Sequence, residues 1–69
     1  MMSVKDAADR LGISKMTLYR MIHEDGFPAA RMRGRYVVPV RVVDEIIRKV
    51  IDAQSTVDVS EWIKRHYAP

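Results

Sequence analysis

The chain has no cysteine, two histidines and no long apolar run, and each shortage excludes a class of protein. Without cysteine, disulfides and thiolate metal sites are excluded. His23 and His66 lie far apart without a ligand pattern nearby, so we expect no zinc site. No segment approaches the roughly 20 apolar residues of a membrane span, and residues 1–6 lack the apolar core of a signal peptide. We therefore expect a cytoplasmic protein with neither a metal nor a membrane segment.

The length of the chain allows one small domain. A chain of 69 residues is too short for more. Such a domain buries only about 60% of the surface that its unfolded chain exposes, so its stability is marginal. Since disulfides are excluded, an efficient helical core or self-association has to supply the stability.

The net charge of +3 is unevenly distributed along the chain. Residues 1–35 contain seven basic and four acidic side chains, a balance of +3, whereas residues 36–69 contain five of each. All the excess positive charge therefore lies in the first half. This asymmetry indicates a polyanionic partner that binds there.

The beginning of the chain predicts two helices joined by a tight turn. Ser3 is a suitable N-cap for a first helix over about 4–11. Gly12 follows it, as expected for a residue in the left-handed conformation at a helix C-terminus. Ser14 then caps a second helix that runs to about Glu24.

The second predicted helix has an apolar and a polar side. Leu18 and Ile22 face the first helix, and polar or basic residues occupy the opposite side, which is the layout of a DNA-binding helix-turn-helix. The arginine on the outer side can contact guanine through two hydrogen bonds. His23 also points outward, but we interpret it as an exposed residue outside the site. The residues predicted to contact DNA from this helix are Ser14, Lys15, Met16, Thr17, Tyr19 and Arg20.

Residues 30–39 change to the period of a strand and predict a short β-hairpin that turns at Gly34. Arg31, Arg33 and Arg35 make this hairpin a basic wing for the phosphate backbone or the minor groove of duplex DNA. Alternatively, the charges guard a strand edge against aggregation. The other basic residues lie among acidic ones and are expected to form a solvated surface: Lys5, Arg10, Arg48, Lys49, Lys64 and Arg65.

Two more helices are predicted in the second half. An apolar stripe of helical spacing indicates a third helix over about 41–54. Asp58 and Glu61 fit a capping box that starts a fourth helix. We divide the chain into a winged helix-turn-helix domain, 1–54, and a C-terminal helical extension, 55–69. The extension is expected to pack on the third helix, to associate with another copy, or both, through Trp62, Ile63 and Tyr67.

Residues 3–48 also resemble a known family. The segments that carry the resemblance are Ser3-Val4-Lys5-Asp6-Ala7-Ala8, Leu11-Gly12-Ile13-Ser14, Thr17-Leu18-Tyr19-Arg20-Met21-Ile22, Phe27-Pro28-Ala29, Gly34-Arg35-Tyr36 and Val38-Pro39. They are similar to excisionase-type domains, which are winged helix-turn-helix modules related to the DNA-binding part of MerR regulators. The resemblance implies a mainly α fold with a small β-hairpin, extended here by a C-terminal helix. It also implies a phage excisionase, or recombination directionality factor. Several copies would bind repeated sites on duplex DNA, bend it and direct a phage integrase towards excision, in the nucleoid of a bacterial host.

Two alternatives stay open. A MerR-like transcriptional regulator usually has a long dimerisation helix and an effector domain, and we expect neither in a chain of this length. A protein-interaction module, such as an antitoxin or adaptor, would carry its basic face incidentally. Catalysis has no support, because no nucleophile, base and orienting acid form a recognisable arrangement and Ser14 is better explained as a cap. We therefore expect no enzymatic activity, no cofactor and no small-molecule ligand.

Overall fold

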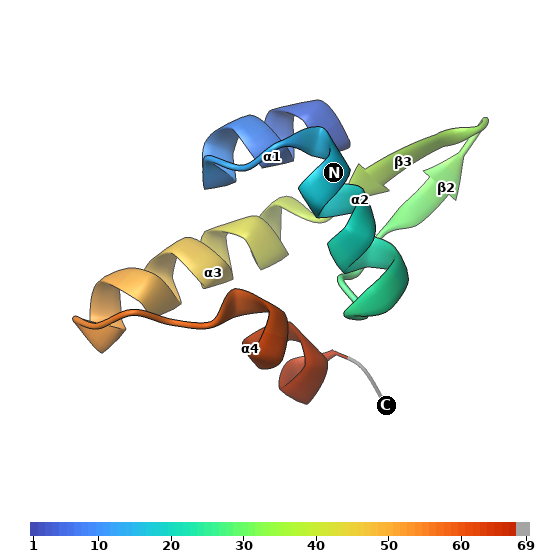
Figure 1. Ribbon diagram of the computed structural model, residues 1–69. Coiled ribbons are helices and arrows are strands. Elements are labelled where there is room, and N and C mark those ends of the chain that lie inside the picture. The colour runs from blue at the N-terminus through green and yellow to red at the C-terminus, as the bar shows by residue number, and fades with distance from the viewer. Residues whose placement is uncertain (68–69) are drawn as a thin grey trace.

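The computed structural model describes residues 1–67 (Figure 1). In chain order, its elements are β1 (Met2–Ser3), α1 (Val4–Leu11), α2 (Lys15–Glu24), β2 (Ala30–Met32), β3 (Arg35–Val38), α3 (Val40–Ala53) and α4 (Val59–His66). The domain is mainly helical with a small antiparallel sheet. This architecture, with its helix-turn-helix and its C-terminal helix, confirms the predicted fold class.

Local hydrogen bonds set the ends of α1 and α2 where the sequence predicts them. The Ser3 side chain accepts a hydrogen bond of 3.0 Å from the backbone N–H of Asp6. Ser14 likewise accepts one of 3.1 Å from the N–H of Thr17. Gly12 has a φ of 73°, and its N–H bonds back to carbonyl groups in the last turn of α1. A left-handed residue here lets the chain reverse between the two helices.

The sheet has one more strand than the sequence predicts. The strand order is β1-β3-β2, and both pairings are antiparallel. In β1, Met2 pairs with Val38 of β3. A strand of two residues is too short to show a period in the sequence, so only the β2–β3 hairpin was predictable. Its turn residues, Arg33 and Gly34, have φ angles of 51° and 77°, and positive values at both positions define a type I′ hairpin turn.

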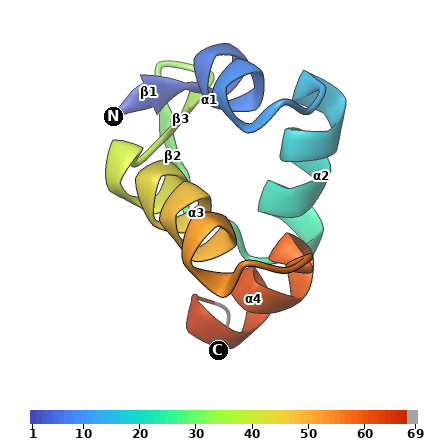
Figure 2. The same cartoon turned by 90° about the vertical axis from the view of Figure 1, so that its left-hand side faces the viewer.

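The core lies where the inner faces of the four described helices meet, on one side of the sheet (Figure 2). Ala7 and Ala8 are buried on α1, and their small side chains allow α2 to approach closely. Leu18 of α2 is fully buried and fixes which face of α2 turns outward. The buried apolar side chains are Val4, Ala7, Ala8, Leu18, Met21, Phe27, Val38, Val42, Val43, Ile46 and Ile63.

Helix α4 closes the base of the molecule beneath α3 and the end of α2 (Figures 1 and 2). Ile63 of α4 is fully buried in the core. The Tyr67 hydroxyl donates a hydrogen bond of 2.5 Å to Glu45 on α3. Lys64 forms an ion pair of 3.6 Å with Asp25, which follows α2. The side chain of Lys64 stays half exposed in this pair, which agrees with the predicted solvated surface of mixed charge.

Surface charges also link elements that are distant in the sequence. Arg10 of α1 lies 2.6 Å from the Asp44 carboxylate on α3, and both side chains stay about half exposed, as a solvated surface of mixed charge requires. The bond from Tyr67 lowers the pKa of Glu45 below its ordinary value of 4.5, and Arg41 at 3.2 Å acts in the same direction. The same bond raises the pKa of Tyr67 above 10.0.

Candidate DNA-binding surface

The outer face of α2 is exposed to solvent. All six residues predicted from this helix and its cap are exposed. The side chain of Met16 is 73% exposed, whereas Leu18, two residues further on, is completely buried. Because burial fixes Leu18 inward, the N-terminal half of α2 has to present the opposite side to solvent. This is the side that a recognition helix turns towards the major groove.

Some of the polar residues on α2 and at its cap already form contacts within the chain. The hydroxyl of Ser14 lies 2.9 Å from that of Thr17, in addition to its capping bond. Arg20 lies 4.0 Å from Glu24, and both side chains are about two-thirds exposed. An exposed pair at i,i+4 contributes only about 0.2–0.5 kcal/mol, so Arg20 can leave it at little cost.

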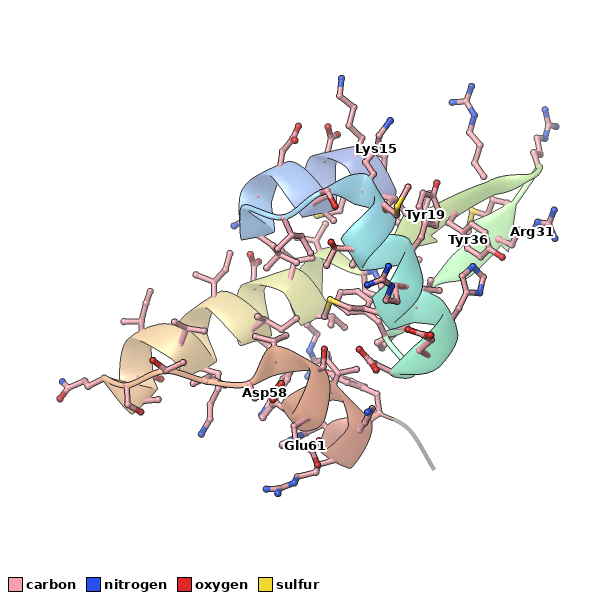
Figure 3. The ribbon with its side chains drawn as sticks, viewed as in Figure 1. Lys15, Tyr19, Arg31, Tyr36, Asp58 and Glu61 are labelled. Carbon is pink, nitrogen blue, oxygen red and sulfur yellow. The ribbon has the colours of Figure 1, made fainter. Side chains whose placement is uncertain are left out.

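The three arginines of the wing do not share one face. Directly paired residues on neighbouring strands project from the same side of a sheet, and successive residues alternate. Arg31 pairs with Tyr36, whereas Arg35 pairs with Met32, the next residue along β2. Arg31 and Arg35 therefore lie on opposite faces, and Arg33 lies in the turn. The wing presents positive charge in several directions, with Arg31 towards its outer end (Figure 3).

A cluster of aromatic side chains joins the wing to α2. The Tyr36 ring meets the rings of Tyr19 and His23 edge to face, with centroid distances of 5.7 and 5.6 Å. The guanidinium carbon of Arg31 lies 5.9 Å from the centre of the same Tyr36 ring. Aromatic pairs of this geometry contribute about 0.5–1.5 kcal/mol beyond the burial of their surface. Tyr19 and Tyr36 are both labelled at this junction in Figure 3.

The sequence pattern did not indicate that Tyr36 and His23 belong to this surface. His23 lies four residues after Tyr19, so both project from the same side of α2. That spacing was visible in the sequence. Their meeting point on β3 was not, because it depends on a long-range contact. Tyr19 was predicted only as a DNA contact, and the structure shows that its ring also packs on Tyr36.

The wing is free of acidic residues, which distinguishes it from the other charged surfaces. The sequence has no aspartate or glutamate between Asp25 and Asp44. Within residues 1–67, no ion pair involves an arginine of the wing or Lys15. A polyanion can therefore approach these cations without displacing a carboxylate.

The described part of the chain contains neither a candidate metal site nor a membrane-spanning helix. Within residues 1–67, no group of three or more histidine, aspartate or glutamate side chains could hold a metal ion. In the same part of the chain, no helix combines the length and the apolar character that crossing a membrane requires.

The residues predicted for self-association already form contacts with other parts of the same chain. Ile63 is fully buried, and the Tyr67 hydroxyl bonds to Glu45. Trp62 is half-buried. Its ring packs against the rings of His66 and Tyr67, with centroid distances of 4.4 and 5.9 Å. Association with another copy through these residues stays a prediction. Among the large apolar residues that follow α2 in the described part of the chain, Ile51 on α3 is the most exposed.

The fold and this surface define a helix-turn-helix protein of the winged type. Residues 1–50, more than half of the chain, match the family described as "Helix-turn-helix domain", and the chain belongs to this family. Searches of curated proteins and of solved structures give no significant match. Membership implies DNA as the partner, and DNA-binding domains of this kind are typically non-enzymatic.

Proposed function

We propose that the protein binds duplex DNA sequence-specifically, with α2 in the major groove and the β2–β3 wing on the adjacent backbone. One observation carries this proposal: the exposed outer face of α2 adjoins an acid-free wing with three arginines, and the contact between Tyr19 and Tyr36 joins the two elements. Base edges in the major groove supply the sequence information, and phosphate contacts fix the position of the protein.

The proposal gives the exposed residues distinct roles. Arg20 reads a guanine, because its guanidinium can donate two hydrogen bonds to that base. Met16 offers an exposed apolar surface that suits the methyl group of thymine. Lys15, the wing arginines and the hydroxyls of Ser14 and Thr17 contact phosphates, which is consistent with their exposure.

We further propose that this DNA binding serves site-specific recombination, as in an excisionase. The resemblance of residues 3–48 to excisionase-type domains supports this role. Several copies would bind repeated sites, bend the DNA and help a phage integrase to assemble an excision complex. Bending a short site by 40–90° costs about 1–6 kcal/mol, so contacts between copies or with the integrase have to offset that cost.

The test begins with in vitro selection of the preferred duplex, followed by footprinting and measurement of DNA bending. The selected site is then placed in a recombination assay with an integrase encoded beside this protein. Repeated sites, a bend and stimulated excision support the excisionase. A single inverted site without an effect on recombination indicates a MerR-like regulator instead. If binding to duplex DNA shows no dependence on salt, the protein is an interaction module such as an antitoxin or adaptor, and the proposal is wrong.

A further inference from the structure

Tyr36 lies between two side chains that are one turn apart on α2. Its ring contacts Tyr19 and His23 at interplanar angles of 75° and 88°. Arg31, its direct partner across the hairpin, lies over the same ring. One half-buried side chain therefore contacts the recognition helix twice and a proposed phosphate-binding arginine once.

The rest of the wing has little to hold it in place. Strand β2 forms the edge of the sheet and pairs with β3 alone among the described strands. Arg31 and Met32 are exposed on β2, and the turn residues Arg33 and Gly34 are exposed as well. Strand β1 supports β3 only at Val37 and Val38, so the outer part of the wing is two-stranded. Because a two-stranded hairpin alone is only marginally stable in water, a side-chain contact on the wing has to help set its direction.

From this arrangement we propose that Tyr36 is a positioning residue, which fixes the wing on α2 so that both elements meet DNA as one rigid unit. Two edge-to-face contacts, with side chains one helical turn apart on α2, restrict both the tilt and the rotation of the ring. Since Arg31 lies on that ring, its direction follows from the same contacts. A wing without this restraint would have to be ordered during binding, and this ordering weakens affinity. The inference rests on the proposed function and assigns a role to two residues, Tyr36 and His23, that the sequence did not predict to contact DNA.

The test measures binding to a duplex of mixed sequence by fluorescence anisotropy over a series of salt concentrations. Tyr36→Leu keeps an apolar side chain but removes the ring, and Tyr36→Phe keeps the ring. We expect Tyr36→Leu to weaken binding and to lower the log–log salt slope by about 0.9 for each phosphate that the wing no longer neutralises. Tyr36→Phe should keep the slope of the wild type. Arg31→Gln should lower the slope in the wild type and change it less in Tyr36→Leu.

Amide hydrogen exchange, measured without DNA, gives a second and independent readout. Tyr36→Leu should speed exchange in β2 and leave the amides of α1 and α3 protected, because opening is confined to the wing. If β2 exchanges as in the wild type, or if the effects of Tyr36→Leu and Arg31→Gln on the slope are additive, the inference is wrong.

His23→Ala decides the question if Tyr36→Leu does not fold. His23 is exposed, so its removal deletes one of the two contacts without opening the core. We expect weaker DNA binding with an unchanged unfolding temperature, and unchanged binding would overturn the inference. A wild-type protein that does not bind DNA in a salt-dependent manner would instead overturn the proposed function, while the exchange experiment would still test the restraint on the wing.

Discussion

The wing and α3 each carry three basic side chains, but these lie in different surroundings. The wing has Arg31, Arg33 and Arg35 and no acidic residue. Helix α3 has three basic and three acidic residues, of which Arg41 pairs with Glu45 at 3.2 Å. Neighbours at i,i+4 on a helix lie about 5–6 Å apart, which is less than the Debye length of about 8 Å at physiological salt. A polyanion therefore meets a nearly neutral surface on α3 and a positive one on the wing.

This difference shows that the number of cations alone does not locate a DNA-binding surface. The acids of α3 also serve the fold, since Asp44 binds Arg10 of α1 and Glu45 binds Tyr67 beyond α4. No carboxylate on the wing makes such a contact, because the wing has none. The contacts of α3 and α4 stabilise the fold, and we propose that the wing and α2 supply the affinity for DNA.

The largest expected effect is on stability, from deleting residues 58–69. This deletion removes Ile63, which is fully buried, and exposes its neighbours in the core. Truncating one buried aliphatic side chain costs about 2–5 kcal/mol, a large part of the about 5–15 kcal/mol that stabilises a typical domain. We expect a much lower unfolding temperature by circular dichroism, whereas substitution of the exposed Arg65 by alanine should leave it unchanged. If the deletion leaves folding intact but removes cooperative binding to repeated sites, the extension serves mainly self-association.

The second prediction compares the wing and α3 directly. Replacing Arg31, Arg33 and Arg35 with glutamine should weaken binding to every duplex and lower the salt slope by about 0.9 for each phosphate that one of these arginines neutralises in the wild type. The matched control replaces the three cations of α3, namely Arg41, Arg48 and Lys49, and changes the net charge by the same amount. We expect the control to keep a slope close to that of the wild type. Equal reductions in the two triple variants would show that only the overall charge matters.

A smaller effect is expected at a single residue of α2. Arg20→Ala should remove the discrimination of one base pair, worth about 1–3 kcal/mol, and leave the fold intact. Arg41→Ala is a matched control, because Arg41 also has a glutamate at i+4 but lies on α3. The measurement is a gel-shift titration of each variant with the selected duplex and with a mixed-sequence duplex. If Arg20→Ala retains both affinity and selectivity, Arg20 does not contact a base.

The sequence predicts those parts of the fold that depend on short-range contacts. The caps at Ser3, Ser14 and Asp58 are confirmed, because each bonds to an N–H three residues further along the chain. The boundaries of α3 differ from the prediction by one residue at each end, where a proline precedes the helix and Gln54 adopts a left-handed conformation. Apolar spacing also predicts the inward side of α2, because helical periodicity is a local property.

Long-range contacts account for what the sequence did not predict. Strand β1 pairs with a partner more than 30 residues away and has no pattern of its own. The opposite directions of Arg31 and Arg35 follow from the register of the hairpin, which a weak turn signal at Arg33-Gly34 leaves open. The roles of Tyr36 and His23 depend on where the wing packs. The nine residues predicted to contact DNA are all exposed, but their contacts with DNA stay a prediction.

The last and smallest effect is a dependence on pH that distinguishes α3 from the wing. Arginine stays charged at every accessible pH, so the charge of the wing is constant. The pKa of Glu45 is lowered by the bond from Tyr67, and this bond therefore stabilises the folded state fully above the ordinary glutamate pKa of 4.5. That contribution disappears as the pH falls through the lowered pKa of Glu45.

The pKa of Tyr67 is raised, so on the alkaline side the contribution of this hydrogen bond disappears only as the pH rises beyond 10.0. Tyr67→Phe should accordingly be less stable than the wild type in urea unfolding at neutral pH, with a difference that vanishes in acid. The effect is small because Glu45 is partly exposed and solvent screens its charge. A difference that stays constant down to acidic pH would show that Tyr67 acts through the packing of its ring, not through its bond to α3.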